Sequence, residues 1–218
     1  MIKQTFLSHE FQVVKGTTHP EYSIFTFESE ERDFRDKYWQ IKDGDVVFDV
    51  GCSYGTYALS ACSAGATVYA FEPEPTVFKD TVVNVGVNGW ENKCFVYNFG
   101  LWGSEETSID MKGYAPHWPA QTITENYKMK TLDQIVVEKN LSKIDWIKID
   151  TEGAEEQVLN GGKTSIKKFQ PRLIIECHTF LDEKIKDRVI AQIKNCGNYI
   201  IEEVSRPPCV MLVCYPQP

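Results

Sequence analysis

The chain has 218 residues, of which 42% are hydrophobic and 25% charged, and its formal net charge is -8. This length suits one α/β domain with a core and excludes two full-sized domains, while the composition excludes disordered and fibrous architectures. The negative charge argues against a sequence-independent grip on nucleic acid, whose phosphates require a basic face. We therefore expect a single domain over residues 1–218 and a small, uncharged or cationic partner.

No run of the sequence approaches the roughly 18 to 20 apolar residues that span a bilayer, and residues 1–10 lack a signal-peptide core. We expect a cytoplasmic protein without a membrane partner. The seven cysteines are scattered, odd in number and without a C-x-x-C pair, which indicates buried apolar residues and neither a disulfide framework nor a zinc cluster.

From Asp45 onward, apolar runs of strand length alternate with segments of helical spacing, which predicts a parallel sheet covered by helices. The predicted strands are 46–50, 67–71, 93–98, 144–149 and 172–177. The predicted helices are 56–63, 75–87, 155–159 and 181–195. Two further strands, 199–204 and 210–215, are joined too closely for a parallel crossover and must be antiparallel neighbours. The pattern predicts a mostly parallel seven-stranded sheet that ends in an antiparallel hairpin, with helices on both faces.

Two stretches interrupt this alternation. Residues 1–44 contain an aromatic cluster, and residues 103–130 are polar with several glycines and prolines. One interpretation is an N-terminal extension that covers an edge and a long surface loop with a small hairpin. The other is a lid and an insertion that reach over the ligand crevice, where such loops usually confer specificity. His117, in the second stretch, would then face the acceptor.

A candidate ligand loop follows the first strand of the predicted sheet. Asp49 lies in that strand and Gly51-Cys52-Ser53-Tyr54-Gly55 leads into the next helix. A strand–glycine turn–helix junction directs backbone N–H groups and the positive helix end at a ligand, and glycine lets the ligand approach. Glu72, at the tip of the second strand, follows Gly51 by about 20 residues, the spacing expected for a carboxylate that binds ribose hydroxyls.

The type of nucleotide follows from the glycine spacing. A dinucleotide fold shows G-x-G-x-x-G, whereas this loop has glycines only at Gly51 and Gly55 and an acid at Asp49. That acid would repel a pyrophosphate but can hold the amino group of a methionine moiety. The loop therefore favours S-adenosylmethionine over NAD or FAD.

With these residues established, the chain resembles class I S-adenosylmethionine-dependent methyltransferases with a Rossmann-like fold, and more closely the FkbM family. The matching pieces are 44–51, Gly55, 70–73, 100–101, 147–155 and 171–176. The most family-specific piece is Lys148-Ile149-Asp150-Thr151-Glu152-Gly153-Ala154-Glu155. The resemblance spans roughly residues 44–180 and leaves out residues 1–40 and 103–130, where acceptor choice should reside.

The resemblance implies an O-methyltransferase that acts on a hydroxyl of a sugar, glycan or natural product and releases S-adenosylhomocysteine. Asp49, Gly51 and Gly55 would line the methionine end and Glu72 with Pro73 the ribose. The backbone of Phe99-Gly100-Leu101 would line the adenine. We also count Asp150 among the donor-site residues. The family tends to have Ala-Asn where this loop has Cys52-Ser53, and this puts the local contacts to the methionine group in doubt.

Catalytic candidates lie where the fourth and fifth predicted strands end. Asp150 and Glu152 follow one strand and His178 the other, and all three should project toward the same crevice. The ordinary pKa of a histidine suits a general base at neutral pH, so His178 is our candidate base, with Asp150 and Glu152 orienting it or binding acceptor hydroxyls. Glu155 and Glu156 are interpreted as acids that favour a helix N-terminus. Lys148, in a buried strand, needs a partner such as Asp150 or Glu176.

Three questions stay open at this stage. A divalent cation at Asp150 and Glu152, with Glu176 or His178, is chemically reasonable, but it is not favoured because no fixed-spacing motif supports it. Two other functions are compatible with the fold: a donor-binding interaction module without catalysis, and an NAD-dependent oxidoreductase. The sequence does not identify the acceptor or the oligomeric state.

Overall fold

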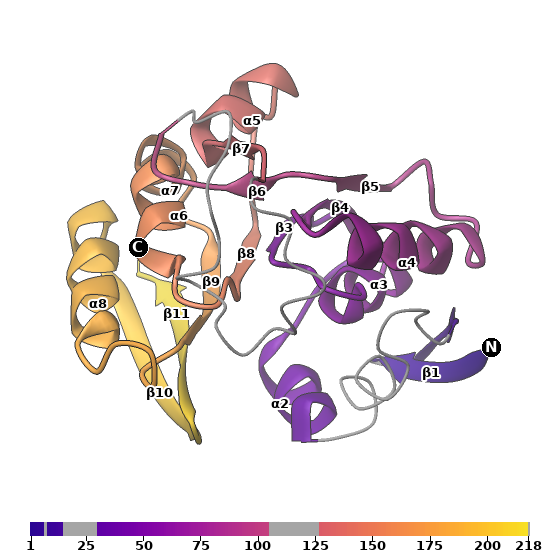
Figure 1. Cartoon of the computed structure of the whole chain (residues 1–218), viewed down its shortest axis with the longest axis horizontal. Coiled ribbons are helices and arrows are strands. Elements are labelled where there is room, and N and C mark those ends of the chain that lie inside the picture. Colours follow the sequence, from indigo (N-terminus) through magenta and orange to yellow (C-terminus); the bar gives the residue numbers. More distant parts are fainter. Residues whose placement is uncertain (7, 15–29, 105–126, 218) are drawn as a thin grey trace. The chain divides into compact units, whose positions relative to one another are not determined.

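The computed structural model describes residues 1–6, 8–14, 30–104 and 127–217 (Figure 1). It consists of two compact units, Met1–Asn98 and Phe99–Pro218. The seven strands that the sequence predicts are all present, three in the first unit and four in the second. The expectation of a single domain over residues 1–218 stays a prediction.

The first unit combines an N-terminal hairpin with a parallel α/β segment. Its strands are β1 (Ile2–Phe6), β2 (His9–Val13), β3 (Val46–Val50), β4 (Thr67–Phe71) and β5 (Cys94–Tyr97). Its helices are α2 (Glu30–Tyr38), α3 (Thr56–Ser63) and α4 (Pro75–Gly86). β1 pairs with β2 in antiparallel fashion, whereas β4 lies between β3 and β5 and is parallel to both. β3 and β4 are buried along almost their whole length, as expected for strands of a parallel sheet that is covered on both faces.

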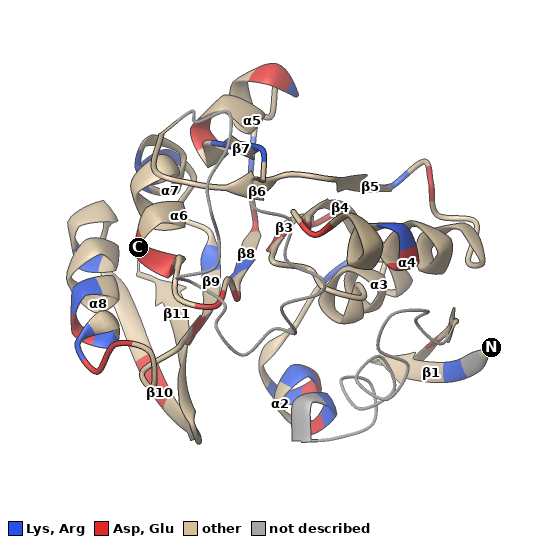
Figure 2. Cartoon of the chain, viewed as in Figure 1, with Lys and Arg blue, Asp and Glu red and all other residues tan. Residues whose placement is uncertain are grey.

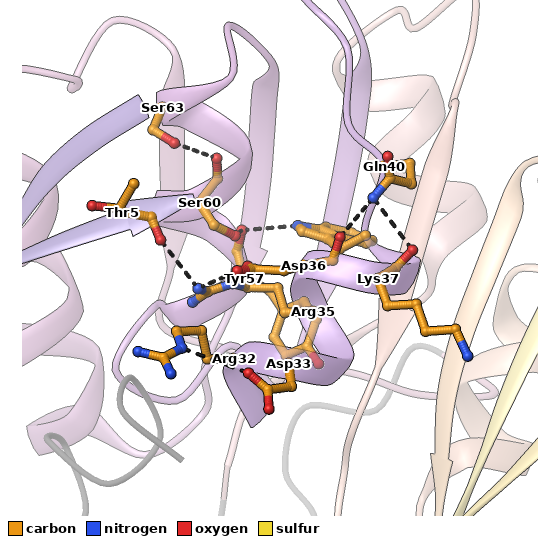
Figure 3. A network of polar contacts seen from close by, with 11 residues as sticks. Thr5, Arg32, Asp33, Arg35, Asp36, Lys37, Gln40, Tyr57, Ser60 and Ser63 are labelled. Carbon is orange, nitrogen blue, oxygen red and sulfur yellow. Dashed lines mark hydrogen bonds and ion pairs between the residues drawn. The ribbon is translucent and has the colours of Figure 1, made fainter. Parts of the chain in front are cut away.

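Helix α2 belongs to the N-terminal extension and is fixed to the rest of its unit by buried polar groups (Figure 3). The guanidinium of Arg35 is fully buried, lies over the ring of Phe6 and donates to the backbone carbonyl of Thr5. The indole of Trp39 donates to the backbone carbonyl of Tyr57 in α3 over 3.3 Å. Residues 30–39 therefore pack as part of the first unit. Whether residues 1–44 also act as a lid stays a prediction.

The second unit contains the remaining strands and helices. Its strands are β6 (Gly100–Leu101), β7 (Met129–Lys130), β8 (Trp146–Ile149), β9 (Arg172–Cys177), β10 (Tyr199–Arg206) and β11 (Cys209–Pro216). Its helices are α5 (Leu132–Glu138), α6 (Glu155–Gly161), α7 (Lys163–Phe169) and α8 (Ile185–Cys196). β8 and β9 are parallel, β11 pairs with β9 in antiparallel fashion, and β10 pairs with β11. The predicted C-terminal antiparallel hairpin is confirmed.

Several elements depart from their predicted limits. β8 begins at Trp146 and α8 at Ile185, both later than predicted, and the two hairpin strands are longer than predicted. α5 and α7 were not predicted. At the borders of the 103–130 stretch, β6 and β7 form a short parallel pair in which Gly100 donates to Lys128 over 2.9 Å. Residues 105–126, which include His117, lie outside the described residues.

Each of the seven cysteines is buried, which confirms their interpretation as apolar core residues. Among the described residues, no helix combines the length and the apolar character needed to cross a membrane.

Candidate functional site

The predicted ligand loop is a tight turn between β3 and α3. Gly51, Ser53 and Gly55 all have positive φ angles, of 72°, 48° and 89°. A Cβ on Gly55 would lie 3.1 Å from the Cγ2 atom of Thr81 in α4, so this position requires glycine for both its conformation and its space. The loop sequence therefore produces the close backbone turn that we expected of a nucleotide site.

Helix α4 braces this loop from the side. The hydroxyl of Thr81 donates to the backbone carbonyl of Ser53, and the amide of Asn84 donates to the carbonyl of Tyr54 over 3.2 Å. Both side chains are buried. Because α4 fixes two loop carbonyls, the loop keeps its shape through the packing of a helix that the sequence analysis did not connect with it.

Glu72 organises the end of β4 next to the loop. One carboxylate oxygen accepts the backbone N–H of Ser53 and the other accepts that of Glu74, both over 3.0 Å. The side-chain amide of Asn98 donates to the backbone carbonyls of Glu72 and Pro73, also over 3.0 Å. Glu72 is 2% exposed, and each carboxylate oxygen can accept a second hydrogen bond. The structure thus brings Glu72 and Ser53 together.

Asp49 is fully buried, and one of its carboxylate oxygens accepts the backbone N–H of Ala58 in the first turn of α3 over 2.9 Å. The first N–H groups of a helix lack partners within the helix, so this acid stabilises the start of α3. Asp49 therefore has a structural role that the sequence analysis did not assign. Its expected contact with a methionine amino group stays a prediction.

The second unit contains the predicted catalytic residues, and it brings all three together. The Nε2 atom of His178 lies 3.1 Å from a carboxylate oxygen of Glu152 and 3.6 Å from one of Asp150. Its Nδ1 atom lies 2.8 Å from a carboxylate oxygen of Glu155. Figure 2 shows acidic residues, in red, at the end of β8 and at the start of α6. These carboxylates and the imidazole are called the acid–histidine cluster below.

Backbone conformation places two of these acids around the ring. Glu152 and Gly153 both have positive φ angles, of 54° and 103°, in the turn between β8 and α6. Glu155 is fully buried and also accepts the backbone N–H of Gly153 over 3.0 Å. The turn therefore folds the carboxylates of Glu152 and Glu155 back onto opposite nitrogens of one imidazole.

The cluster determines the charge of His178. Burial opposes the charged ring, but the hydrogen bonds that the ring donates to Glu152 and Glu155 and the charge of Asp150 outweigh it and raise the pKa of His178 to about 11. The ring is therefore a cation at neutral pH. A general base must be unprotonated, so the structure favours a fixed cation over the expected base at this position.

Lys148, which is buried, has the partner that the sequence analysis expected: its ammonium lies 3.3 Å from a carboxylate oxygen of Asp150. Burial opposes the ionisation of Asp150, but the charges of Lys148, His178 and Arg206 lower its pKa. Asp150 thus faces three cations, Lys148, His178 and Arg206.

Two sets of residues in the described part of the chain have the geometry to hold a metal ion. They are Asp150, Glu152 and His178, and Glu176, His178 and Cys209, with ligand atoms within 4.8 Å of one another in each set. Both sets share His178, whose two ring nitrogens already face carboxylates. A divalent metal stays unfavoured.

The predicted adenine segment lies in the second unit. Gly100 and Leu101 are buried in β6, and the ring of Phe99 lies 5.4 Å from the ammonium of Lys130. A Cβ on Gly161 would lie only 1.9 Å from the backbone carbonyl oxygen of Trp102, so α6 packs directly against the residue that follows this segment. The role of residues 99–101 in binding adenine stays a prediction.

The sequence analysis missed two residues that shape the site. Glu155 was interpreted as an acid that favours a helix start, although it contacts His178. Asn98 was only the end of a predicted strand, although its amide ties Glu72 to the end of β5. No sequence signal marks either contact, because both depend on the tertiary arrangement around the side chains.

A comparison with known protein families now places the chain. The model of the methyltransferase FkbM domain matches residues 45–200. The chain belongs to the FkbM methyltransferase domain family. This confirms the resemblance inferred from residues 44–180.

Two characterised FkbM-type proteins are similar in sequence. The hexuronic acid methyltransferase AglP of Haloferax volcanii is 28% identical over 159 residues, which are 71% of this chain and 65% of that protein. The 31-O-demethyl-FK506 methyltransferase FkbM of Streptomyces tacrolimicus is 24% identical over 207 residues, covering 75% of this chain and 76% of that protein. The chain thus spans slightly less than two thirds of the length of the Haloferax volcanii relative.

Solved structures share the fold at low sequence identity. The methyltransferase FkbM from Methylobacillus flagellatus has a TM-score of 0.59 and 17% identity, covering 82% of this chain and 46% of that protein. A precorrin-6y C5,15-methyltransferase from Geobacter metallireducens has a TM-score of 0.54 and 10% identity, covering 85% of this chain and 88% of that protein. These matches confirm the predicted class I methyltransferase fold.

Proposed function

We propose that this FkbM-family chain is an S-adenosylmethionine-dependent O-methyltransferase that acts on a hydroxyl of a sugar, glycan or natural-product-like small molecule. The observation that carries the proposal is the ligand loop: a Cβ-free turn at Gly51 and Gly55 beside the carboxylate of Glu72. These features fit the donor, because glycines admit it closely and a carboxylate accepts hydrogen bonds from ribose hydroxyls.

Each end of the donor has proposed contacts on this chain. Gly51, Cys52, Ser53 and Gly55, with Asp49 behind them, would hold the methionine end. Glu72 and Pro73 would hold the ribose. The segment Phe99-Gly100-Leu101 would hold the adenine, and Asp150 would also contact the donor. The Ser53 N–H already donates to Glu72, so this loop residue would set the position of the carboxylate that binds the ribose.

The acid–histidine cluster would carry the proton chemistry. Bound S-adenosylmethionine supplies an electrophilic methyl group, and an in-line displacement requires the acceptor oxygen to be aligned with it. As the oxygen–carbon bond forms, the hydroxyl proton has to leave. Asp150 and Glu152, whose side chains are 29% and 27% exposed, are the carboxylates of the cluster that solvent reaches. They would receive that hydroxyl and its proton, which then passes to water as S-adenosylhomocysteine is released.

The acceptor class is supported by the relatives and by charge. One relative is named for a hexuronic acid and another for 31-O-demethyl-FK506. The chain itself carries a net charge of -8. We therefore propose a small acceptor that offers a hydroxyl, and no nucleic-acid substrate.

Isothermal titration calorimetry with S-adenosylmethionine, followed by methyl transfer to a panel of hexosides, hexuronates and macrolide alcohols, tests the proposal. We expect donor binding in the micromolar range and methylation of at least one hydroxyl compound. Absence of binding at millimolar donor would reject the proposal. Binding without product on any acceptor would favour an interaction module, and thermal stabilisation by NAD alone would favour an oxidoreductase.

A further inference from the structure

Glu155 is the most deeply buried carboxylate of the acid–histidine cluster. Its side chain is fully buried, whereas those of Asp150 and Glu152 are 29% and 27% exposed. It lies 2.8 Å from the Nδ1 atom of His178 and accepts the N–H of Gly153. A buried carboxylate is costly unless it is hydrogen-bonded and paired, and here His178 and the Gly153 N–H are its partners.

The adjacent residue shows what an ordinary acid at this helix start does. Glu156 is 24% exposed in its side chain and pairs with the guanidinium of Arg188 in α8 over 2.7 Å. It makes no contact with His178 among the described residues. Glu155 and Glu156 are thus adjacent in the first turn of α6 and carry the same charge, but only Glu155 contacts the imidazole. They form a matched pair for experiments.

The geometry also decides which atoms can accept a proton. Both nitrogens of His178 face carboxylate oxygens, so both are placed to donate and neither is placed to accept. The carboxylates that reach solvent are Asp150 and Glu152. Asp150 forms ion pairs with Lys148, over 3.3 Å, and with His178. Glu152 lies in the turn between β8 and α6 and has a positive φ angle.

We propose that Glu155 is a positioning residue that holds His178 between two carboxylates, and that Glu152, rather than His178, is the catalytic base. Glu155 fixes the ring, and the ring fixes one oxygen of Glu152. In the transfer step the acceptor oxygen forms its bond to the methyl carbon while the sulfur–carbon bond breaks. The hydroxyl proton passes to the carboxylate of Glu152 and then to water. This inference rests on the proposed methyl transfer.

Two measurements on the unaltered protein test it. The first is the titration of the His178 ring by nitrogen-15 NMR, which requires no turnover. We expect a doubly protonated ring from pH 6 to pH 9. The second is the pH profile of kcat. A carboxylate base predicts a flat kcat between pH 7 and pH 9, whereas a histidine base with a pKa near 11 predicts a rise of about tenfold per pH unit.

Variants separate positioning from folding. Glu155→Gln keeps the shape and removes the charge beside Nδ1. We expect His178 to titrate at lower pH and kcat to fall about tenfold, with the acceptor KM changed less than threefold. Glu152→Gln should lower kcat at least a hundredfold with unchanged donor affinity. Glu156→Gln, the matched control, should change kcat less than twofold.

Several outcomes would overturn the inference while methyl transfer persists: a ring that titrates near neutral pH, a kcat that climbs steadily to pH 9, or full activity in Glu152→Gln. If Glu155→Gln does not fold, the two measurements on the unaltered protein still decide. Failure of the proposed function would look different, because a doubly protonated ring would then coexist with absent donor binding or absent turnover.

Discussion

The ligand loop and the acid–histidine cluster are built by different means. The loop is held mainly by backbone groups: Ser53 and Glu74 donate their N–H groups to Glu72, and Thr81 fixes a loop carbonyl. The cluster is held by charged side chains around one buried imidazole. Backbone turns tolerate changes of pH, whereas ion pairs respond to every proton gained or lost. The chemistry and the stability of the second unit should therefore depend on pH.

The largest expected effect comes from removing the ring at the centre of the cluster. His178→Ala leaves Glu152 without its partner, so we expect turnover to fall at least a hundredfold, about 2.7 kcal/mol in activation free energy. Donor affinity should change less than threefold because the ligand loop is untouched. Steady-state kinetics and calorimetry on the same preparation check this, with circular dichroism to show that the variant folds. Equal losses in turnover and affinity would mean that His178 serves donor binding.

A smaller effect is expected at the ligand loop. Glu72→Gln replaces one acceptor oxygen by an amide that faces a backbone N–H, so the donor Kd should rise roughly thirtyfold, about 2 kcal/mol. The control is Glu74→Gln, since Glu74 accepts the N–H groups of Thr76 and Val77 at the start of α4. That variant should lower stability and leave the donor Kd within threefold. If both variants bind the donor as the unaltered protein does, the ribose contact is elsewhere.

The pH dependence of stability distinguishes the two regions further. The pKa of His178 is raised in the folded protein from an ordinary value near 6.5 to about 11, so the folded state holds a proton that the unfolded state releases. The stabilisation is complete below pH 6.5 and is lost as pH rises toward 11. From this group alone, the free energy of unfolding should fall by at most about 1.4 kcal/mol per pH unit. Urea unfolding at several pH values measures it, and His178→Gln should flatten the slope.

The smallest effect is expected from metal removal. Because Asp150 faces Lys148, Arg206 and a protonated His178, dialysis against a chelator should change kcat less than twofold. Loss of activity that magnesium or manganese restores would contradict this expectation and would reassign Asp150 and Glu152 as metal ligands.

The sequence predicted the elements in which local pattern and tertiary packing agree. β3, α3 and β4 have the limits predicted from apolar runs and glycine stops. Helix α5 was missed because it is short, although Thr131 and Gln134 form a capping box that marks its start. α7 was missed because Gly161 and Gly162 hide the continuation of helical structure after α6.

For the site, the sequence predicted which residues gather but not how they share protons. Asp150, Glu152 and His178 meet because adjacent parallel strands end at the same edge. The charge of His178 depends on Glu155, and Glu155 reaches the ring only through the turn at Glu152 and Gly153. Gly153 permits that turn, but the sequence alone does not show which side chains the turn brings to the ring.

The burial of all seven thiols has a practical consequence. Cysteine-directed reagents such as maleimides require a solvent-accessible sulfur, and each native sulfur is enclosed in the core. A cysteine introduced at Val137, which is 79% exposed on α5, would therefore be the preferred target for a fluorophore or a surface tether. The protein can be labelled at a chosen point without first deleting its own cysteines, so the enzyme assayed would differ from the native chain at one position.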